Sequence, residues 1–166
     1  MKKFIIILSV FISTNVIAQT KAASSYTKDC SIFINAIASS DLSNIYNGNA
    51  PLTIFIPDNT AFQKLPAGAM DSLLKPENKA ILTALLGNHI IKGVFTAKNI
   101  AKQINLNSGK AAFTTLAGTK LTATIDANRN IVLTDENGNQ TIIKVFDIKQ
   151  DNKILFIVNS VINYKK

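Results

Sequence analysis

The chain has 166 residues and a formal net charge of +8, with 47% hydrophobic and 17% charged residues. These values are typical of one globular domain with a sizeable core, and the single cysteine and single histidine exclude an internal disulfide and a zinc site built from Cys and His alone. The positive charge comes from singly scattered lysines and one arginine, Arg129, which indicates a solvated basic surface and differs from the clustered pattern of nucleic-acid-binding proteins.

The beginning of the chain is typical of a secretory signal peptide. Two lysines precede the apolar run Phe4–Ile12, and small or branched residues, Val16 and Ala18, stand at positions −3 and −1 of a cleavage site. The run is shorter than the roughly 20 apolar residues of a membrane-spanning helix. We therefore expect a secreted protein, located in the periplasm, at the cell surface or outside the cell. The expected parts are a cleaved signal peptide at residues 1–18, a flexible lead-in at 19–28 and a single domain at 29–166.

The first half of that domain is predicted to form short helices around one strand. Asp29 is expected to cap the first helix, and Asp58 or Asn59 the helix that follows the strand. Ile81 belongs to an apolar stripe that we expect to be buried. The predicted helices lie near residues 30–37, 41–45, 59–65, 69–74, 77–86 and 97–102, the last capped by Thr96, and the predicted strand is Leu52–Ile56. Cys30, in the first helix, is expected to be a buried small hydrophobe.

The second half is rich in β-branched residues and turn signals. Predicted strands cover residues 112–116, 120–125, 131–134, 141–145 and 154–162. Asp135 and Glu136 are expected in a hairpin turn, and Asp147 is expected to begin a loop. Asn139-Gln140-Thr141 has the form of a glycosylation sequon, which we interpret as a turn. Helices followed by strands favour an α+β fold.

The turn Pro57-Asp58-Asn59-Thr60 could be a polar ligand site or a structural boundary. Pro57 fixes φ and ends the strand, while a carboxylate or amide directly before a helix accepts hydrogen bonds from its first N–H groups. We interpret the turn as structural.

His89 is the only histidine of the chain, so it is the side chain that we expect to titrate near neutral pH. A catalytic role needs a nucleophile and an orienting carboxylate, and no motif such as Gly-x-Ser-x-Gly is present. We expect a semi-buried histidine that ties a helix end to the neighbouring turn by hydrogen bonds, with Asn59 or Asp58 as one candidate acceptor.

Three stretches together resemble the fasciclin domain family. The first contains Thr53, Phe55, Pro57, Asn59, Ala61 and Phe62. The second runs from Leu85 through His89 to Gly93 and on to Thr96. The third contains Asp147 and Asn152 before the last predicted strand. Lys153, Phe156 and Asn159 stand where the family usually has Gly, His and Asp, and the closing Pro is absent, so the chain resembles a divergent member.

The resemblance implies a fasciclin-like α+β fold, a β-sandwich or wedge core with several short helices packed mainly from the N-terminal half. It also implies a secreted, non-catalytic binding module for cell adhesion or extracellular matrix, with no cofactor or metal. The implied partner is a protein or polysaccharide at a cell surface or matrix, not a nucleic acid or a membrane span.

Two parts of the chain are expected to offer a binding surface. One is the loop at 105–110. The other contains Asn88, His89, Ile90 and Lys92, where the family's Tyr-His pair has been linked to receptor recognition and Asn88 takes the tyrosine's position. The alternative function is a periplasmic small-ligand or glycan-binding protein, and the third is an enzyme centred on His89.

Overall fold

The structure, a computed structural model, describes residues 28–163. The expected signal peptide at 1–18 and lead-in residues 19–27 lie outside the described residues. The helices are α2 (Ser31–Ala38), α3 (Ser43–Asn47), α4 (Asn59–Gln63), α5 (Ala69–Leu73), the 3-10 turn η1 (Pro76–Asn78), α6 (Lys79–Gly87) and α7 (Ala97–Leu106). The strands are β1 (Leu52–Pro57), β2 (Ile90–Lys92), β3 (Ala111–Thr114), β4 (Lys120–Ile125), β5 (Ile131–Thr134), β6 (Gln140–Gln150) and β7 (Lys153–Val158).

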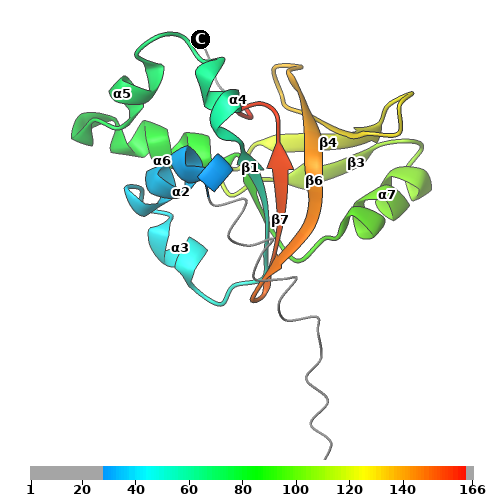
Figure 1. The fold of residues 1–166 in the computed structure, drawn as a ribbon. Helices are drawn as coiled ribbons and strands as arrows, with labels where there is room; N and C mark the ends of the chain where they lie inside the picture. The colour runs from blue at the N-terminus through cyan, green and yellow to red at the C-terminus, as the bar shows by residue number, and fades with distance from the viewer. Residues whose placement is uncertain (1–27, 164–166) are drawn as a thin grey trace, which may run out of the picture.

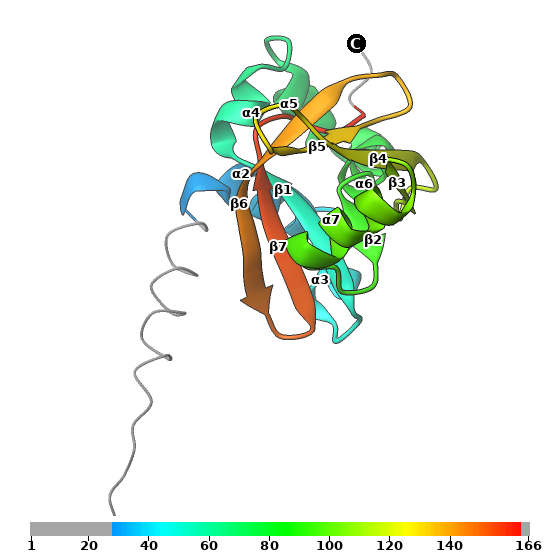
Figure 2. The ribbon, with the colours of Figure 1, turned by 90° about the vertical axis from the view of Figure 1, so that its right-hand side faces the viewer.

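The described strands form a seven-stranded sheet in the order β2-β1-β7-β6-β5-β4-β3. β1 and β7 pair in parallel, and all other neighbours pair antiparallel. A single bridge between Ile91 and Thr115 links the two ends of the sheet, which curls back on itself (Figure 2). The predicted α+β fold with a β-sandwich or wedge core is confirmed, and a single curled sheet builds that core.

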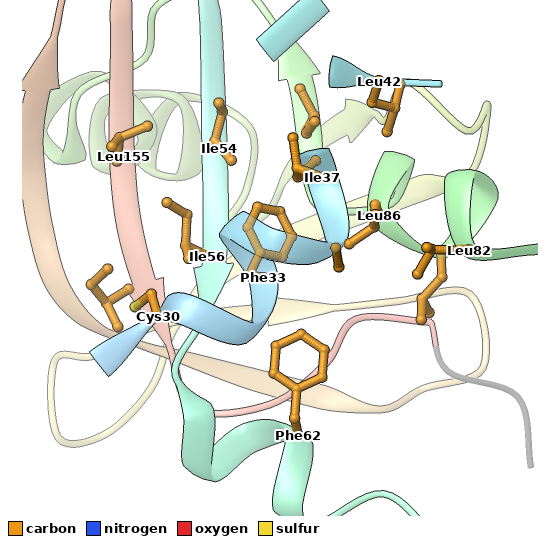
Figure 3. Packing of buried hydrophobic residues seen from close by; sticks show 14 of the residues in the cluster. Cys30, Phe33, Ile37, Leu42, Ile54, Ile56, Phe62, Leu82, Leu86 and Leu155 are labelled. Carbon is orange, nitrogen blue, oxygen red and sulfur yellow. The ribbon is translucent and has the colours of Figure 1, made fainter. Parts of the chain in front are cut away.

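β1 and β7 separate two hydrophobic cores because successive side chains of a strand point to opposite faces. Ile54 and Ile56 of β1 join Leu155 of β7 in a core with the helices α2–α6, whereas Phe55 and Phe156 face the inside of the curl. Figure 1 shows α2–α6 gathered on one side of these strands and α7 on the other. Figure 3 shows the helix side of this division, where Phe33 of α2 lies against Ile54 and Ile56. Both faces of β1 and β7 are therefore buried.

The turn after β1 caps two helices. Asp58 is the N-cap of α4, and its Oδ1 accepts a hydrogen bond from Ala61 N at 2.8 Å, as predicted. Asn59 Oδ1 accepts from Ile32 N of α2 at 3.1 Å, while its Nδ2 donates to the backbone oxygen of Lys28. The expected cap by Asp29 is wrong, because α2 has Cys30 at its N-cap without a side-chain bond and receives its cap from Asn59.

Several elements differ from the predictions near their ends. α7 continues to Leu106, and β7 ends at Val158 and not near Ile162. Ile81 is 59% exposed, so its predicted burial is wrong.

Asp147 lies inside the long strand β6, at a register irregularity with φ of 56°, and does not begin a loop. Its Oδ1 accepts from Ala97 N at 2.7 Å, which adds a cap to α7 beside the Thr96 capping box.

The turn between β6 and β7 is tied to the loop before β1. Lys153 is only 3% exposed, and its Nζ donates to the backbone oxygen of Gly48 at 2.7 Å. Asn152 Nδ2 donates to the backbone oxygen of Asn49 at 3.2 Å. Lys153 takes the position where the resemblance predicts glycine, and the long side chain holds the two loops together.

Replacing Asn59 with alanine should lower the free energy of unfolding by about 1–3 kcal/mol, because it removes a helix cap and leaves the Ile32 N–H unpaired. Denaturant titration measures the change. Asn128→Ala is the control, since Asn128 is exposed and its side chain has no hydrogen bond within the described residues. Equal stability of the two variants would contradict the capping role.

Candidate functional site

His89 lies between α6 and β2 and is completely buried. Its Nε2 accepts a hydrogen bond from Ile162 N at 2.9 Å, so Nδ1 carries the ring proton and donates to the backbone oxygen of Leu85 at 3.0 Å. Phe33 contacts the ring edge-on, with centroids 5.6 Å apart. The predicted hydrogen-bonded role at a helix end is confirmed, but the ring is fully buried where partial burial was expected, and neither Asp58 nor Asn59 is its partner.

This environment removes His89 from chemistry near neutral pH. Burial lowers the pKa of His89 to about 4, although the bond to the Leu85 oxygen acts in the opposite direction. Both ring nitrogens are already bonded to backbone groups. The histidine therefore joins the end of α6 to the segment after β7, and the expected titration near neutrality is wrong.

The remaining motif residues of β1 also hold the scaffold. Thr53 Oγ1 donates to the backbone oxygen of Gly93 at 2.8 Å and accepts from Phe95 N at 2.9 Å. Phe55 stacks on Phe156 with centroids 5.5 Å apart. Phe156 stands where the resemblance predicts histidine, so an aromatic stack of the inner core occupies that position.

Asp58 forms an ion pair with Lys144, with 2.7 Å between Oδ2 and Nζ. Burial by itself raises the pKa of Asp58, but hydrogen bonds from Lys144, Thr60 and the Ala61 N–H outweigh it and hold that pKa below its usual value. A carboxylate held in its charged form by these donors serves as a cap, which supports the structural interpretation of the turn.

Three of the four residues of one predicted binding surface are buried, which contradicts that prediction for Asn88, His89 and Ile90. Asn88 is 5% exposed and His89 and Ile90 are fully buried, so among these four only Lys92 is exposed. The second predicted surface, residues 105–110, is exposed throughout. Its role in binding stays a prediction.

The described surface has hollows of about 290 Å³ and more, one of them beside Lys75 and Pro76. A polar groove of about 760 Å³ lies between α4 and the segments around the β5–β6 turn and after β7; it includes Lys64, Asn137, Asn139, Gln140, Thr141 and Ser160. A smaller hollow of about 290 Å³, which we call the Asn88 pocket, is lined by Leu73, Ile81, Ala84, Leu85, Asn88, Ala117, Thr119 and Asn163.

The Asn88 pocket combines residues that sequence reasoning had not brought together. α5 and α6 supply its apolar side, and Ala117 and Thr119 of the β3–β4 turn supply the other. Gly87 permits this close approach, because a Cβ at Gly87 would lie 3.2 Å from Ala117 N. In the sequence Ile81 belonged only to an apolar stripe, and its exposure at the border of the pocket is known from the structure alone.

The described residues contain no group of three or more His, Cys, Asp or Glu side chains placed to hold a metal ion. Cys30 is fully buried, and burial raises its pKa to about 12, so it packs as an inert hydrophobe as predicted. Within residues 28–163, no helix has the length and apolar character needed to cross a membrane.

Comparison with known proteins adds family evidence. The family model described as "Fasciclin domain" matches residues 28–164. Protein sll1483 of Synechocystis sp. is 32% identical over 132 residues, which cover 80% of this chain and 66% of that protein. Human periostin is 28% identical over 134 residues, which cover 81% of this chain and 14% of periostin.

Among solved structures, a FAS1 domain pair from the insect cell adhesion molecule fasciclin I matches with a TM-score of 0.61 and 20% identity. The match covers 78% of this chain and 43% of that chain. It supports the α+β architecture described above. The chain spans no more than about two thirds of any of these three proteins.

Acid should destabilise the protein through His89. The pKa of His89 is about 4 in the folded state against an ordinary 6.5, so the unfolded chain takes up the proton first as the pH falls. Stability present above pH 6.5 should be lost progressively, by about 3 kcal/mol at pH 4. Denaturant titrations at pH 7, 5 and 4 measure this loss, and His89→Gln, which does not titrate, should show a flatter profile. Parallel profiles for the two proteins would contradict the assignment.

Proposed function

Because the chain belongs to the fasciclin domain family, we propose that it is a secreted module that binds a protein partner at a cell surface or in an extracellular matrix. The fasciclin domain is a non-catalytic, adhesion-type domain, and the chain is not an enzyme. The family match covers residues 28–164. The partner and the secretion of this chain are the proposed part.

The observation that carries the proposal is the use of the family's motif residues. These residues form hydrogen bonds and ring contacts inside the fold, and none of those groups is left for a partner: Thr53, Phe55, Asn59 and His89. A rigid scaffold of this kind presents binding residues between and beyond its elements. Recognition then depends on the exposed surface, which varies between members of a family more readily than a core.

Secretion is supported by the first residues of the chain. Two lysines, an apolar run and a Val-x-Ala site have the order of a cleavable signal. We propose that cleavage after Ala18 releases one domain with a short lead-in. The mature protein then acts in the periplasm or outside the cell.

A polysaccharide-binding function is the second candidate, and the polar groove favours it. Asp135 Oδ1 accepts from the backbone N–H groups of Asn137 and Asn139, and Oδ2 accepts from Asn139 Nδ2, which fixes the turn at the groove. Thr141 is 2% exposed, and its hydroxyl has no hydrogen bond among the described residues. A row of amides and hydroxyls with Lys64 beside it matches the mixed donors and acceptors of a hydroxyl-rich ligand.

A capture experiment tests the proposed function. The mature protein, immobilised, should retain a component of the source organism's cell-surface material, and prior protease treatment of that material should abolish capture. Periodate, which oxidises sugar diols, should leave capture intact. Capture of nothing would reject the proposed function.

The same experiment separates the two candidates. The polysaccharide alternative predicts the opposite pattern, in which periodate abolishes capture, protease does not, and Lys64→Gln weakens it. Lys75→Gln is the matched control, because Lys75 lies outside the groove.

A further inference from the structure

The Asn88 pocket contains a hydrogen-bond donor whose direction is fixed by its neighbours. Thr119 Oγ1 donates to Asn88 Oδ1 at 2.6 Å, which uses the one proton of that hydroxyl. The 2.8 Å contact between Thr115 Oγ1 and Thr119 Oγ1 is then a bond donated by Thr115. These two hydrogen bonds, from Thr115 to Thr119 and from Thr119 to Asn88, therefore hold the Asn88 side-chain amide with its oxygen toward the β3–β4 turn.

Within residues 28–163, the one side-chain hydrogen bond of Asn88 is made by its oxygen. No hydrogen bond to Asn88 Nδ2 exists among the described residues, although the residue is only 5% exposed. Asn88 is one of the residues that line the pocket, so an acceptor that enters the pocket comes close to this amide. A nearly buried amide gains most from an acceptor that enters the pocket.

The β3–β4 turn, which contains Thr115 and Thr119, is anchored to the sheet by backbone hydrogen bonds. Leu116 N donates to the backbone oxygen of Ile90 at 2.8 Å, and Thr115 N donates to the backbone oxygen of Thr119 at 2.9 Å. Thr115 also takes part in the bridge that links the two ends of the sheet. The donor is thus held in place before any ligand arrives, which reduces the entropy cost of binding.

The rest of the pocket is apolar and small. Leu73, Ala84 and Leu85 line it, and Ile81, 59% exposed, stands at its border. Its volume of about 290 Å³ lies at the lower limit of small-molecule pockets, which span about 300–1,000 Å³. That size suits one large side chain, and interface anchors are side chains that fill such pockets.

We propose that the Asn88 pocket receives one large apolar side chain of a protein partner, while a carbonyl oxygen of the same peptide segment accepts from Asn88 Nδ2. A polypeptide carries a carbonyl within a few bonds of every side chain, so it meets both requirements of the pocket at once. This inference rests on the proposed function, and it names the chemistry that the partner presents.

Titration with N-acetyl-leucine N-methylamide tests the pocket directly. In ¹H–¹⁵N correlation spectra of the mature chain, saturable shifts should appear at the Asn88 side-chain amide, at Leu85 and at Thr119. N-acetyl-glycine N-methylamide, which has the carbonyl without the side chain, should bind at least tenfold more weakly. Absent shifts, or shifts spread over the surface, would overturn the proposal.

Three variants identify the contact. Ile81→Asp places a charge at the border of the pocket and should weaken binding of the leucine probe about tenfold or more. Ile45→Asp is the matched control, because Ile45 is a helical isoleucine, 41% exposed, outside the pocket. Asn88→Asp keeps an acceptor for Thr119 but replaces the donor with an oxygen, and should weaken binding by a similar factor. If Asn88→Asp does not fold, Ile81→Asp with its control still decides, and unchanged affinity would overturn the proposal.

Surface capture with the same variants separates this inference from the proposed function. Wild-type protein that captures a protein component, while Ile81→Asp does not, supports both. Equal capture by wild type and Ile81→Asp contradicts the pocket and leaves the proposed function standing. Probe binding without any surface capture contradicts the proposed function and leaves the pocket standing.

Discussion

The parallel pairing of β1 with β7 is the constraint on which the rest of the structure depends. These strands begin about a hundred residues apart in the chain, yet they run side by side from Leu52 opposite Lys153 to Pro57 opposite Val158. Both are buried on both faces and form the wall between the helix-covered core and the inside of the curled sheet. Because a buried strand must bond every N–H and C=O group, neither core can keep its shape if this pairing is lost.

The position of the Asn88 pocket follows from that arrangement. β2 pairs with β1 on the outer edge and brings His89 and the end of α6 against the segment after β7. The Ile91–Thr115 bridge then places the β3–β4 turn beside α6, and Gly87 leaves room for it. The Asn88 pocket is therefore a product of sheet closure, and the turn that holds the Asn88 amide is anchored to the sheet.

Strands, turns and helix caps could be predicted from the sequence because each depends on residues that are close together in the chain. The apolar run ending in Pro57 predicted β1, and Asp58 and Thr96 predicted their caps correctly. Contacts between distant segments carried no comparable signal: the bond from Asn59 to α2, the cap that Asp147 gives α7, and the bond from Ile162 to His89 all join residues far apart in sequence. The site was hidden for the same reason, since Asn88 and Thr119 meet only after the sheet curls.

Native-state hydrogen exchange tests the role of the β1–β7 pair most directly. The amides of Leu52 and Asp58, at the two ends of β1, donate to the backbone oxygens of Asn152 and Val158 on the β7 side, so the amides of Ile54 and Ile56 between them face β7 as well. The account predicts that the amides of Ile54 and Ile56 exchange only by global unfolding, with equal free energies and equal dependence on denaturant. The amides of β3–β5 should not survive longer than these. Exchange of Ile54 or Ile56 through a smaller opening, while β3–β5 remain protected, would contradict the account.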